Sequence, residues 1–267
     1  FLVAEMISIT HLQAENLPSL PQRILKYLLV YCRQGSLYLE IDEAAYTLAE
    51  GEAITVTSGQ MHTFTALEGN ALLLDFTLDF FCKDDNDIEL VFHNGLFCHF
   101  GLNEVIPVRD ASYFGSILNK IETELAQEPY QYLISARAHI ELLLVELNRS
   151  KVERGDEIWK PDALFLRFLE FVRENYREQP TVKDYTARLG TTEAKLNELS
   201  KLHTGKTAQN VVFSLTVSEA KRLLRYYDLS VKEIAFQLGF ADPFYFSNFF
   251  KKHTAVSPVR YRAAHPI

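Results

Sequence analysis

The stretch GFADPFYFSNFFKKHT, residues 239–254, places aromatic rings, an amide and two lysines close together. Asp242 can cap a helix and a proline follows it at the first helical position, so a helix is predicted to begin near residue 243. Phe246, Phe249 and Phe250 recur at the spacing of a buried stripe. The side chains left on the opposite face are Phe244, Tyr245, Asn248, Lys251 and Lys252.

Each residue on this opposite face has chemistry that suits DNA. Phe244 and Tyr245 can contact thymine methyl groups or sugars, and Asn248 can bond the adenine edge in bidentate fashion. Lys251 and Lys252 suit phosphates. The alternatives are exposed aromatic residues without a function and a solvated basic helix end.

A second copy of this pattern lies earlier in the chain. At an offset of 50 residues, Leu196 aligns with Phe246 and Lys201 with Lys251. Each copy holds a capped helix, a turn at a glycine and a second capped helix. This is the plan of a helix-turn-helix, whose second helix lies in the major groove of DNA. The two predicted units, joined by a connecting helix, span residues 181–207 and 230–257.

The second helix of the earlier unit offers a weaker set of contacts. Glu198 would repel phosphate, although it could accept a hydrogen bond from cytosine. Thr192 and Asp242 are the predicted caps of the two second helices and lie beside the DNA in this arrangement. The later unit is therefore expected to anchor the protein. The residues predicted to contact DNA in the first unit are Thr192, Ala194, Lys195, Asn197, Glu198 and Lys201, and the second unit adds Asp242 to the five named above.

Four stretches resemble, in order and spacing, the signature of the AraC/XylS family of transcriptional regulators: AKRLL, SVKEIAFQLGF, DPFYFSNFFKKHT and SPVRYR. The resemblance is strongest across residues 181–262 and implies two helix-turn-helix units. Less specifically, it implies a cupin-like N-terminal barrel followed by helices used for dimerisation. Residues 48–64 are similar to the barrel segment in which a glycine turn, an apolar strand and a histidine follow one another. The sequence departs from the family at Asn248 and Thr216, where arginine is usual.

The N-terminal half shows strand patterns. Short β-rich runs separated by turn signals occupy residues 24–82, which predicts an antiparallel sandwich or barrel. Residues 91–100 suggest one more hairpin. Helical periodicity follows in residues 112–126 and 132–150, and the second of these segments carries a wide apolar stripe. The stripe can pack on the barrel or pair with the same helix of another subunit, and it consists of Leu133, Ala136, Ile140, Leu143 and Leu144.

The chain is therefore expected to hold an all-β N-terminal domain followed by two helices, and an all-α C-terminal domain. The predicted divisions are a cupin-like sensory barrel at 1–110, a helical dimerisation segment at 111–150, a charged linker at 151–161 and a DNA-binding domain at 162–267.

Charge is divided unevenly between these parts. Residues 163–267 carry 16 Lys or Arg against 10 Asp or Glu, a net charge of +6, whereas residues 1–162 carry a net charge of −14. A basic module beside an acidic one indicates that only the basic module approaches a polyanion.

The barrel is expected to bind a small-molecule effector through Tyr31, Tyr38, Glu40 and His62, polar groups in an otherwise apolar cavity. The alternative is a structural histidine and surface tyrosines. A metal site is not predicted, because His62 stands alone in its strand, and no cofactor is expected. Two other functions stay open: a metal-dependent cupin enzyme with an appended DNA-targeting module, and a regulator with a filled barrel.

The cysteines, Cys32, Cys82 and Cys98, form no close pair and suggest reduced thiols in the cytoplasm. No apolar run has the length of a membrane span, so no membrane partner is expected. The expected partners are double-stranded DNA, an effector and a second copy of the chain, with RNA polymerase as a further candidate.

Overall fold

The computed structural model describes residues 3–18, 20–97, 103–156 and 158–265. The chain divides into two compact units, Phe1–Ala163 and Leu164–Ile267. We call them the strand unit and the helical unit and describe each by itself. The expected fold class, an N-terminal β domain with two following helices and an all-helical C-terminal domain, is confirmed.

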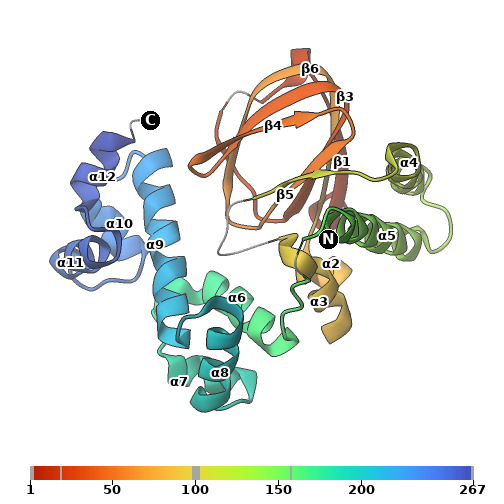
Figure 1. Ribbon diagram of the computed structural model, residues 1–267. Coiled ribbons are helices and arrows are strands. Elements are labelled where there is room, and N and C mark those ends of the chain that lie inside the picture. The colour runs from red at the N-terminus through yellow and green to blue at the C-terminus, as the bar shows by residue number, and fades with distance from the viewer. Residues whose placement is uncertain (1–2, 19, 98–102, 157, 266–267) are drawn as a thin grey trace. The chain divides into compact units, whose positions relative to one another are not determined.

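The strand unit is built on one antiparallel sheet that curls around its own core (Figure 1). The sheet has the strand order β1-β6-β3-β5-β7, while β2 pairs with β6 and β4 pairs with β3. The strands are β1 (Ile7–Gln13), β2 (Gln22–Arg23), β3 (Tyr27–Ile41), β4 (Ala44–Ala49), β5 (Glu52–Val56), β6 (Met61–Phe76) and β7 (Val105–Pro107).

Two long strands, β3 and β6, run antiparallel along most of their length and form the middle of the sheet. Gly35 and Gly69 face each other across this pair with φ values of +79° and +100°. A side chain at either position would overlap the backbone carbonyl of the opposite strand, so the close approach of the two strands requires glycine there. Alternating residues of β3, among them Leu28, Val30 and Leu39, fill the core inside the curl.

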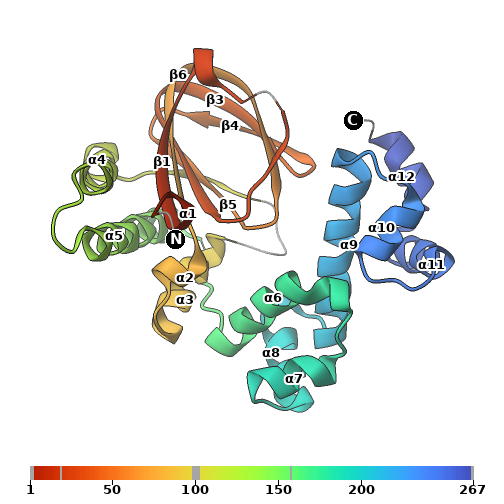
Figure 2. The same cartoon turned by 180° about the vertical axis from the view of Figure 1, so that it is seen from behind.

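Helices follow the sheet. The short helices are α1 (Val3–Met6), α2 (Leu78–Phe81) and α3 (Asp85–Phe92), and the long ones are α4 (Ala111–Gln127) and α5 (Tyr132–Glu153). α4 and α5 lie side by side as an antiparallel pair, as Figures 1 and 2 show from opposite sides.

Three expectations for the strand unit are corrected. Strand β1 was not expected, although it pairs with β6 along its whole length. The hairpin predicted at 91–100 is replaced, over its described residues, by the end of α3 and a short 3-10 turn. Asp84 starts α3 by accepting hydrogen bonds from the amides of Asn86 and Asp87. Finally, α5 continues three residues into the predicted linker, because Lys151 is buried and forms ion pairs with Glu104 and Asp156.

The helical unit contains α6 (Ala163–Asn175), α7 (Val182–Leu189), α8 (Glu193–Thr204), α9 (Ala208–Tyr226), α10 (Val231–Gln237), α11 (Pro243–Thr254) and α12 (Pro258–Ala264). The pairs α7–α8 and α10–α11 are the two helix-turn-helix units, and α9 connects them. The predicted connecting helix is α9, and Thr207 caps its first turn by accepting a hydrogen bond from the amide of Asn210. A core of α9, α10 and α11 side chains includes Leu224, Ile234 and Phe246.

No helix within the described residues combines the length and apolar character that crossing a bilayer requires.

Candidate nucleic-acid interface

The second helix of each unit begins at the predicted cap. Thr192 accepts a hydrogen bond from the amide of Lys195 at 3.2 Å, and Asp242 accepts one from the amide of Phe244 at 2.9 Å. Pro243 occupies the first turn of α11, where no amide partner is needed. The caps fix where α8 and α11 begin, and therefore which side chains point away from the core.

On α11, the buried and exposed faces separate as expected. Phe246 and Phe250 are fully buried, and the ring of Phe249 lies 5.2 Å from that of Phe240. Phe244 and Tyr245 are 72% and 67% exposed. These two rings form one exposed face with three further exposed side chains, and we call the five together the α11 face: Phe244, Tyr245, Asn248, Lys251 and Lys252.

The same face recurs on α8 at an offset of 50 residues. Lys195 and Glu198 form an ion pair of 3.2 Å on it, so the carboxylate is partly neutralised by its neighbour. Leu202 is 71% exposed and stands where α11 has Lys252. Sequence reasoning missed Leu202, although the repeat offset points to it. The exposed residues of this α8 face are Ala194, Lys195, Glu198, Lys201 and Leu202.

Asn197 lies outside the α8 face, contrary to the expectation that it contacts DNA. Its side-chain amide donates to the carbonyl of Glu193 at 2.9 Å, and its side-chain oxygen accepts from the amide of Ala208 at 3.0 Å. Asn197 thus joins α8 to the first turn of α9. The spacing of polar residues on a helix does not reveal such a contact with the next element.

The turns that aim the two helices differ. Gly190 and Gly239 both have positive φ, at +62° and +80°. A side chain at Gly190 would meet nothing within 4 Å, whereas one at Gly239 would overlap the backbone carbonyl of Arg177. Gln179 strengthens this contact by donating to the carbonyl of Leu238 at 3.0 Å. The segment after α6 therefore supports the turn of the second unit directly.

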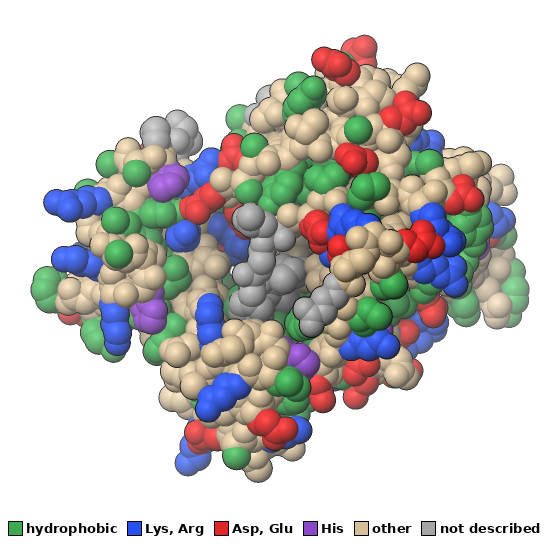
Figure 3. Space-filling view, in the orientation of Figure 1, with side chains coloured by type: hydrophobic (Ala, Val, Ile, Leu, Met, Phe, Trp, Pro, Cys, Tyr) green, Lys and Arg blue, Asp and Glu red, His purple; other side chains and the backbone are tan. Residues whose placement is uncertain are grey.

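The end of α11 is basic. Lys251, Lys252 and His253 occupy its last turn, where cations interact favourably with the helix dipole. Burial, and secondarily the charge of Lys252, hold the pKa of His253 below its usual value, so the imidazole is neutral at pH 7. Figure 3 shows Lys and Arg side chains around α11 and α12, and Asp and Glu side chains at one end of the strand unit.

The four residues expected to bind an effector are not gathered in one place. His62 is buried and pairs with Ile41, so it shares the core side of the sheet. Tyr38 and Glu40 alternate with core residues of β3 and therefore lie on the outer side. Tyr31 also points outward, where its ring lies 5.0 Å from that of Phe114 on α4. A continuous apolar run such as residues 27–32 hides the phase of the alternation, which is why the sequence did not separate them.

His62 is the polar group of this set that faces the core. Burial lowers its pKa to about 4, so the ring is neutral at pH 7. Its Nδ1 atom finds no hydrogen-bond partner among the described residues, and its ring packs 5.3 Å from that of Phe64. Within the described ranges, no three His, Cys, Asp or Glu side chains are arranged to hold a metal ion. Cys98, one of the three cysteines expected to be reduced thiols, lies outside those ranges.

The apolar stripe of α5 faces its own strand unit. Ala136, Ile140, Leu143 and Leu144 are buried, which decides the open alternative for these four in favour of packing within the chain. A different set of α5 side chains is exposed. Ile134, Leu142 and Val152 are 52%, 42% and 44% exposed.

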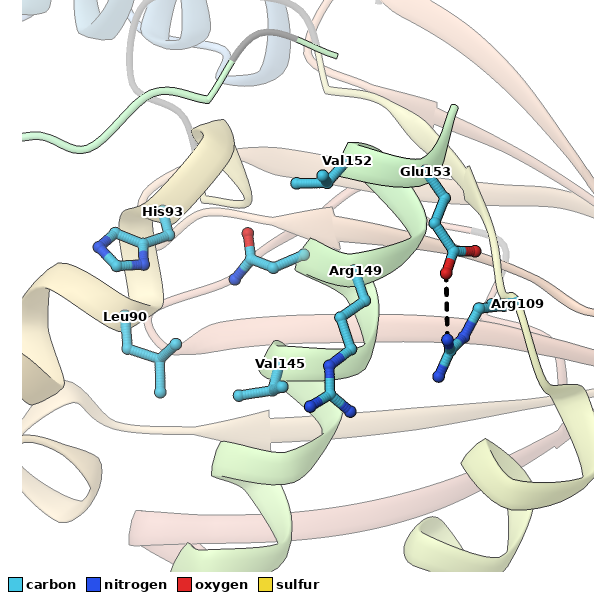
Figure 4. Close-up of a pocket in the computed structure, with 8 residues that line it drawn as sticks. Leu90, His93, Arg109, Val145, Arg149, Val152 and Glu153 are labelled. Atoms are coloured by element: carbon cyan, nitrogen blue, oxygen red, sulfur yellow. Dashed lines mark hydrogen bonds and ion pairs between the residues drawn. The ribbon is translucent and has the colours of Figure 1, made fainter. Parts of the chain in front are cut away.

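A groove of about 460 Å³ lies along the second half of α5. Leu90 and His93 come from one side, Val145 and Val152 rise from α5, and Arg109 lies on the other side, where it forms an ion pair with Glu153 (Figure 4). The groove is apolar along its floor and charged at its rim.

The chain is similar to several known proteins. Residues 185–264 match the family model described as a helix-turn-helix domain. The HTH-type transcriptional activator RhaS of Escherichia fergusonii is 33% identical over 116 residues, which are 43% of this chain and 41% of RhaS. The uncharacterized HTH-type transcriptional regulator YisR of Bacillus subtilis is 24% identical over 88% of this chain and 84% of YisR. A crystal structure of ToxT from Vibrio cholerae is 15% identical, covers 98% of both chains and has a TM-score of 0.44.

The match to RhaS covers about two fifths of that protein. The matched family model falls on the segment that holds both glycine turns, both capped second helices and the connecting helix. These features confirm the resemblance drawn from the sequence. The chain therefore contains, at residues 185–264, a helix-turn-helix domain of the AraC type.

Proposed function

We propose that the chain is a transcriptional regulator that binds double-stranded DNA through α11 and, more weakly, through α8. The observation that carries this proposal is the duplicated exposed face. Two capped helices of equal length present side chains at the same positions, 50 residues apart, while their other faces pack into the helical unit. Two such helices on one connecting helix suit successive contacts with a duplex.

The two faces differ in what they offer DNA. The α11 face carries two rings, an amide and two lysines, with no acidic side chain. On the α8 face, Glu198 offsets Lys195 and Leu202 replaces a lysine. Since phosphate contacts supply much of the affinity and base-edge contacts supply specificity, α11 is the main contact.

We further propose that the strand unit brings two copies together through α5. Ile134, Leu142, Val145 and Val152 line up along one side of this helix, and the groove in Figure 4 continues their surface. An apolar floor with a charged rim is the usual composition of an interface between proteins.

An effector and further partners complete the proposal. His62, with its unsatisfied ring nitrogen on the core side of the sheet, is the side chain best placed to bond a small molecule there. RNA polymerase is the partner through which a bound regulator of this kind would act, and the cytoplasm is where the chain would meet its DNA. The relatives named above are called transcriptional activators or regulators, so the metal-dependent enzyme is not the favoured alternative.

The first test is capture of genomic DNA fragments by the full-length chain at one fixed salt concentration, followed by sequencing. Enrichment of a defined site supports the proposal, and fragments without a common sequence contradict it.

Lys251→Ala then tests the contact directly. Loss of one phosphate contact should reduce the slope of log affinity against log salt by about one unit. Lys120→Ala, which removes an exposed lysine of the strand unit, is the matched control and should leave the slope unchanged. Equal slopes for the Lys251 variant and the unaltered chain would remove Lys251 from the interface.

A further inference from the structure

The helical unit contains a cavity of about 130 Å³. It lies among α7, α9, α11 and the segments before α7 and α11, so both helix-turn-helix units contribute to it. The side chains that matter for its chemistry are Tyr185, Phe213, Thr216, Phe240, Tyr245 and Phe249.

The size of the cavity limits what it can hold. A cavity of about 150 Å³ lined by apolar side chains accepts benzene in a protein interior. The volume here is similar, and aromatic rings surround it, with Phe213 and Phe240 each within 5.4 Å of Phe249 between ring centres. A single six-membered ring fits, and edge-to-face or tilted contacts with these rings are favourable.

One polar group in the cavity wall lacks a partner. Tyr185 is fully buried against Phe168 and Phe171 of α6, and its hydroxyl forms no hydrogen bond within the described part of the chain. Burial raises the pKa of this phenol, so the hydroxyl keeps its proton and can donate. A buried hydroxyl without a partner is costly, and a ligand that bonds it would recover that energy. By contrast, the hydroxyl of Thr216 already donates to the carbonyl of Val212 at 3.0 Å.

The charge of the ligand follows from the lining. The described side chains that line the cavity include no Lys, Arg, His, Asp or Glu. A charged ligand would lose its hydration without gaining a counter-ion. We propose that this cavity is a binding site for a neutral, single-ring aromatic molecule whose polar group forms a hydrogen bond with the hydroxyl of Tyr185.

Such a ligand would also contact α11. Tyr245 lines the cavity and belongs to the α11 face, and Phe249 follows one turn later. A bound ring would restrict the Tyr245 side chain and the packing of α11 on α9. This consequence for DNA affinity rests on the proposed function, whereas binding itself does not.

Phenol is the probe, and the full-length chain is titrated with it in the absence of DNA by calorimetry or ligand-observed NMR. We expect saturable binding that Tyr185→Phe weakens by about tenfold, the worth of one hydrogen bond. Tyr261→Phe is the matched control, because it removes another buried hydroxyl without a partner in the described residues of the same unit, away from the cavity. It should leave phenol affinity unchanged.

Benzoate provides a second arm, since it has the same ring with a negative charge and should bind more weakly than phenol. Absence of saturable phenol binding overturns the proposal. Equal affinity of the unaltered chain and the Tyr185 variant overturns it as well. Because no DNA is present, these outcomes are independent of whether α11 contacts DNA.

Discussion

Asn248 lies in the middle of the α11 face, one turn after the two exposed rings and one turn before the two lysines. Its amide can donate to and accept from one adenine edge. We expect Asn248→Ala to relax preference at a single position of the bound site, at a cost of about 1 to 3 kcal/mol. The measurement is affinity for a panel of sites that differ by one base pair. A uniform loss across the panel would show that Asn248 positions the helix without reading a base.

His62 predicts a pH dependence of the strand unit. Its pKa is about 4 when folded, against about 6.5 for an exposed histidine. Between these values the unfolded chain binds more protons, so stability falls as pH decreases through this window. His62 should therefore lower the free energy of unfolding by about 3 kcal/mol between pH 7 and pH 4. His62→Gln should flatten the pH dependence of urea unfolding over this range. A variant curve parallel to that of the unaltered chain would contradict the buried, neutral state.

For single residues, the sequence predicted which side chains are exposed better than it predicted which other residues they contact. The α11 face followed from a cap and the spacing of phenylalanines, which local rules determine. The role of Asn197 depends on a hydrogen bond to Ala208 in the next helix, and the outward direction of Tyr31 depends on where α4 packs. Both contacts join elements that are separate in sequence, so the residue pattern of one segment cannot predict them.

At the scale of elements, the two turn glycines make a matched pair. Gly239→Ala should destabilise the chain by about 3 kcal/mol or more, because left-handed backbone strain adds to overlap with the carbonyl of Arg177. Gly190→Ala has the strain without the overlap and should cost roughly 1 kcal/mol. Urea unfolding of both variants measures the difference. Equal losses of unfolding free energy would mean that the backbone near Arg177 moves to accommodate the new side chain at little cost.

The elements that the sequence predicted well are those bounded by strong local signals. The first helix of each helix-turn-helix unit begins at a capping box, formed by Thr181 with Asp184 and by Ser230 with Glu233. Strand β1 lacked such signals, and it exists because β6 offers it an edge over seven paired positions. The extension of α5 depends on the ion pair of Lys151 with Glu104, which is distant in sequence. Local chemistry therefore predicted the helical unit more completely than the sheet.

For the whole molecule, the uneven charge assigns different tasks to the two units. The helical unit is basic and the strand unit strongly acidic, so a duplex would attract the first and repel the second. A regulator with one basic module gains affinity and length of site by pairing with a second copy. The proposed pairing through α5 would join two chains through their acidic units, so that the pair carries two basic units.

Leu142→Glu tests this arrangement. The leucine is 42% exposed on α5, so a carboxylate there should leave folding intact but oppose an apolar interface. We expect the variant to sediment as a monomer where the unaltered chain sediments as a dimer. It should also lose the added affinity for DNA that carries two copies of the site, while it keeps its affinity for one copy. Leu25→Glu is the control, because Leu25 is 75% exposed in the same unit but away from α5. If both variants stay dimeric, two copies meet through a surface other than α5; if the unaltered chain is itself a monomer, the two helix-turn-helix units of one chain must supply all of the specificity.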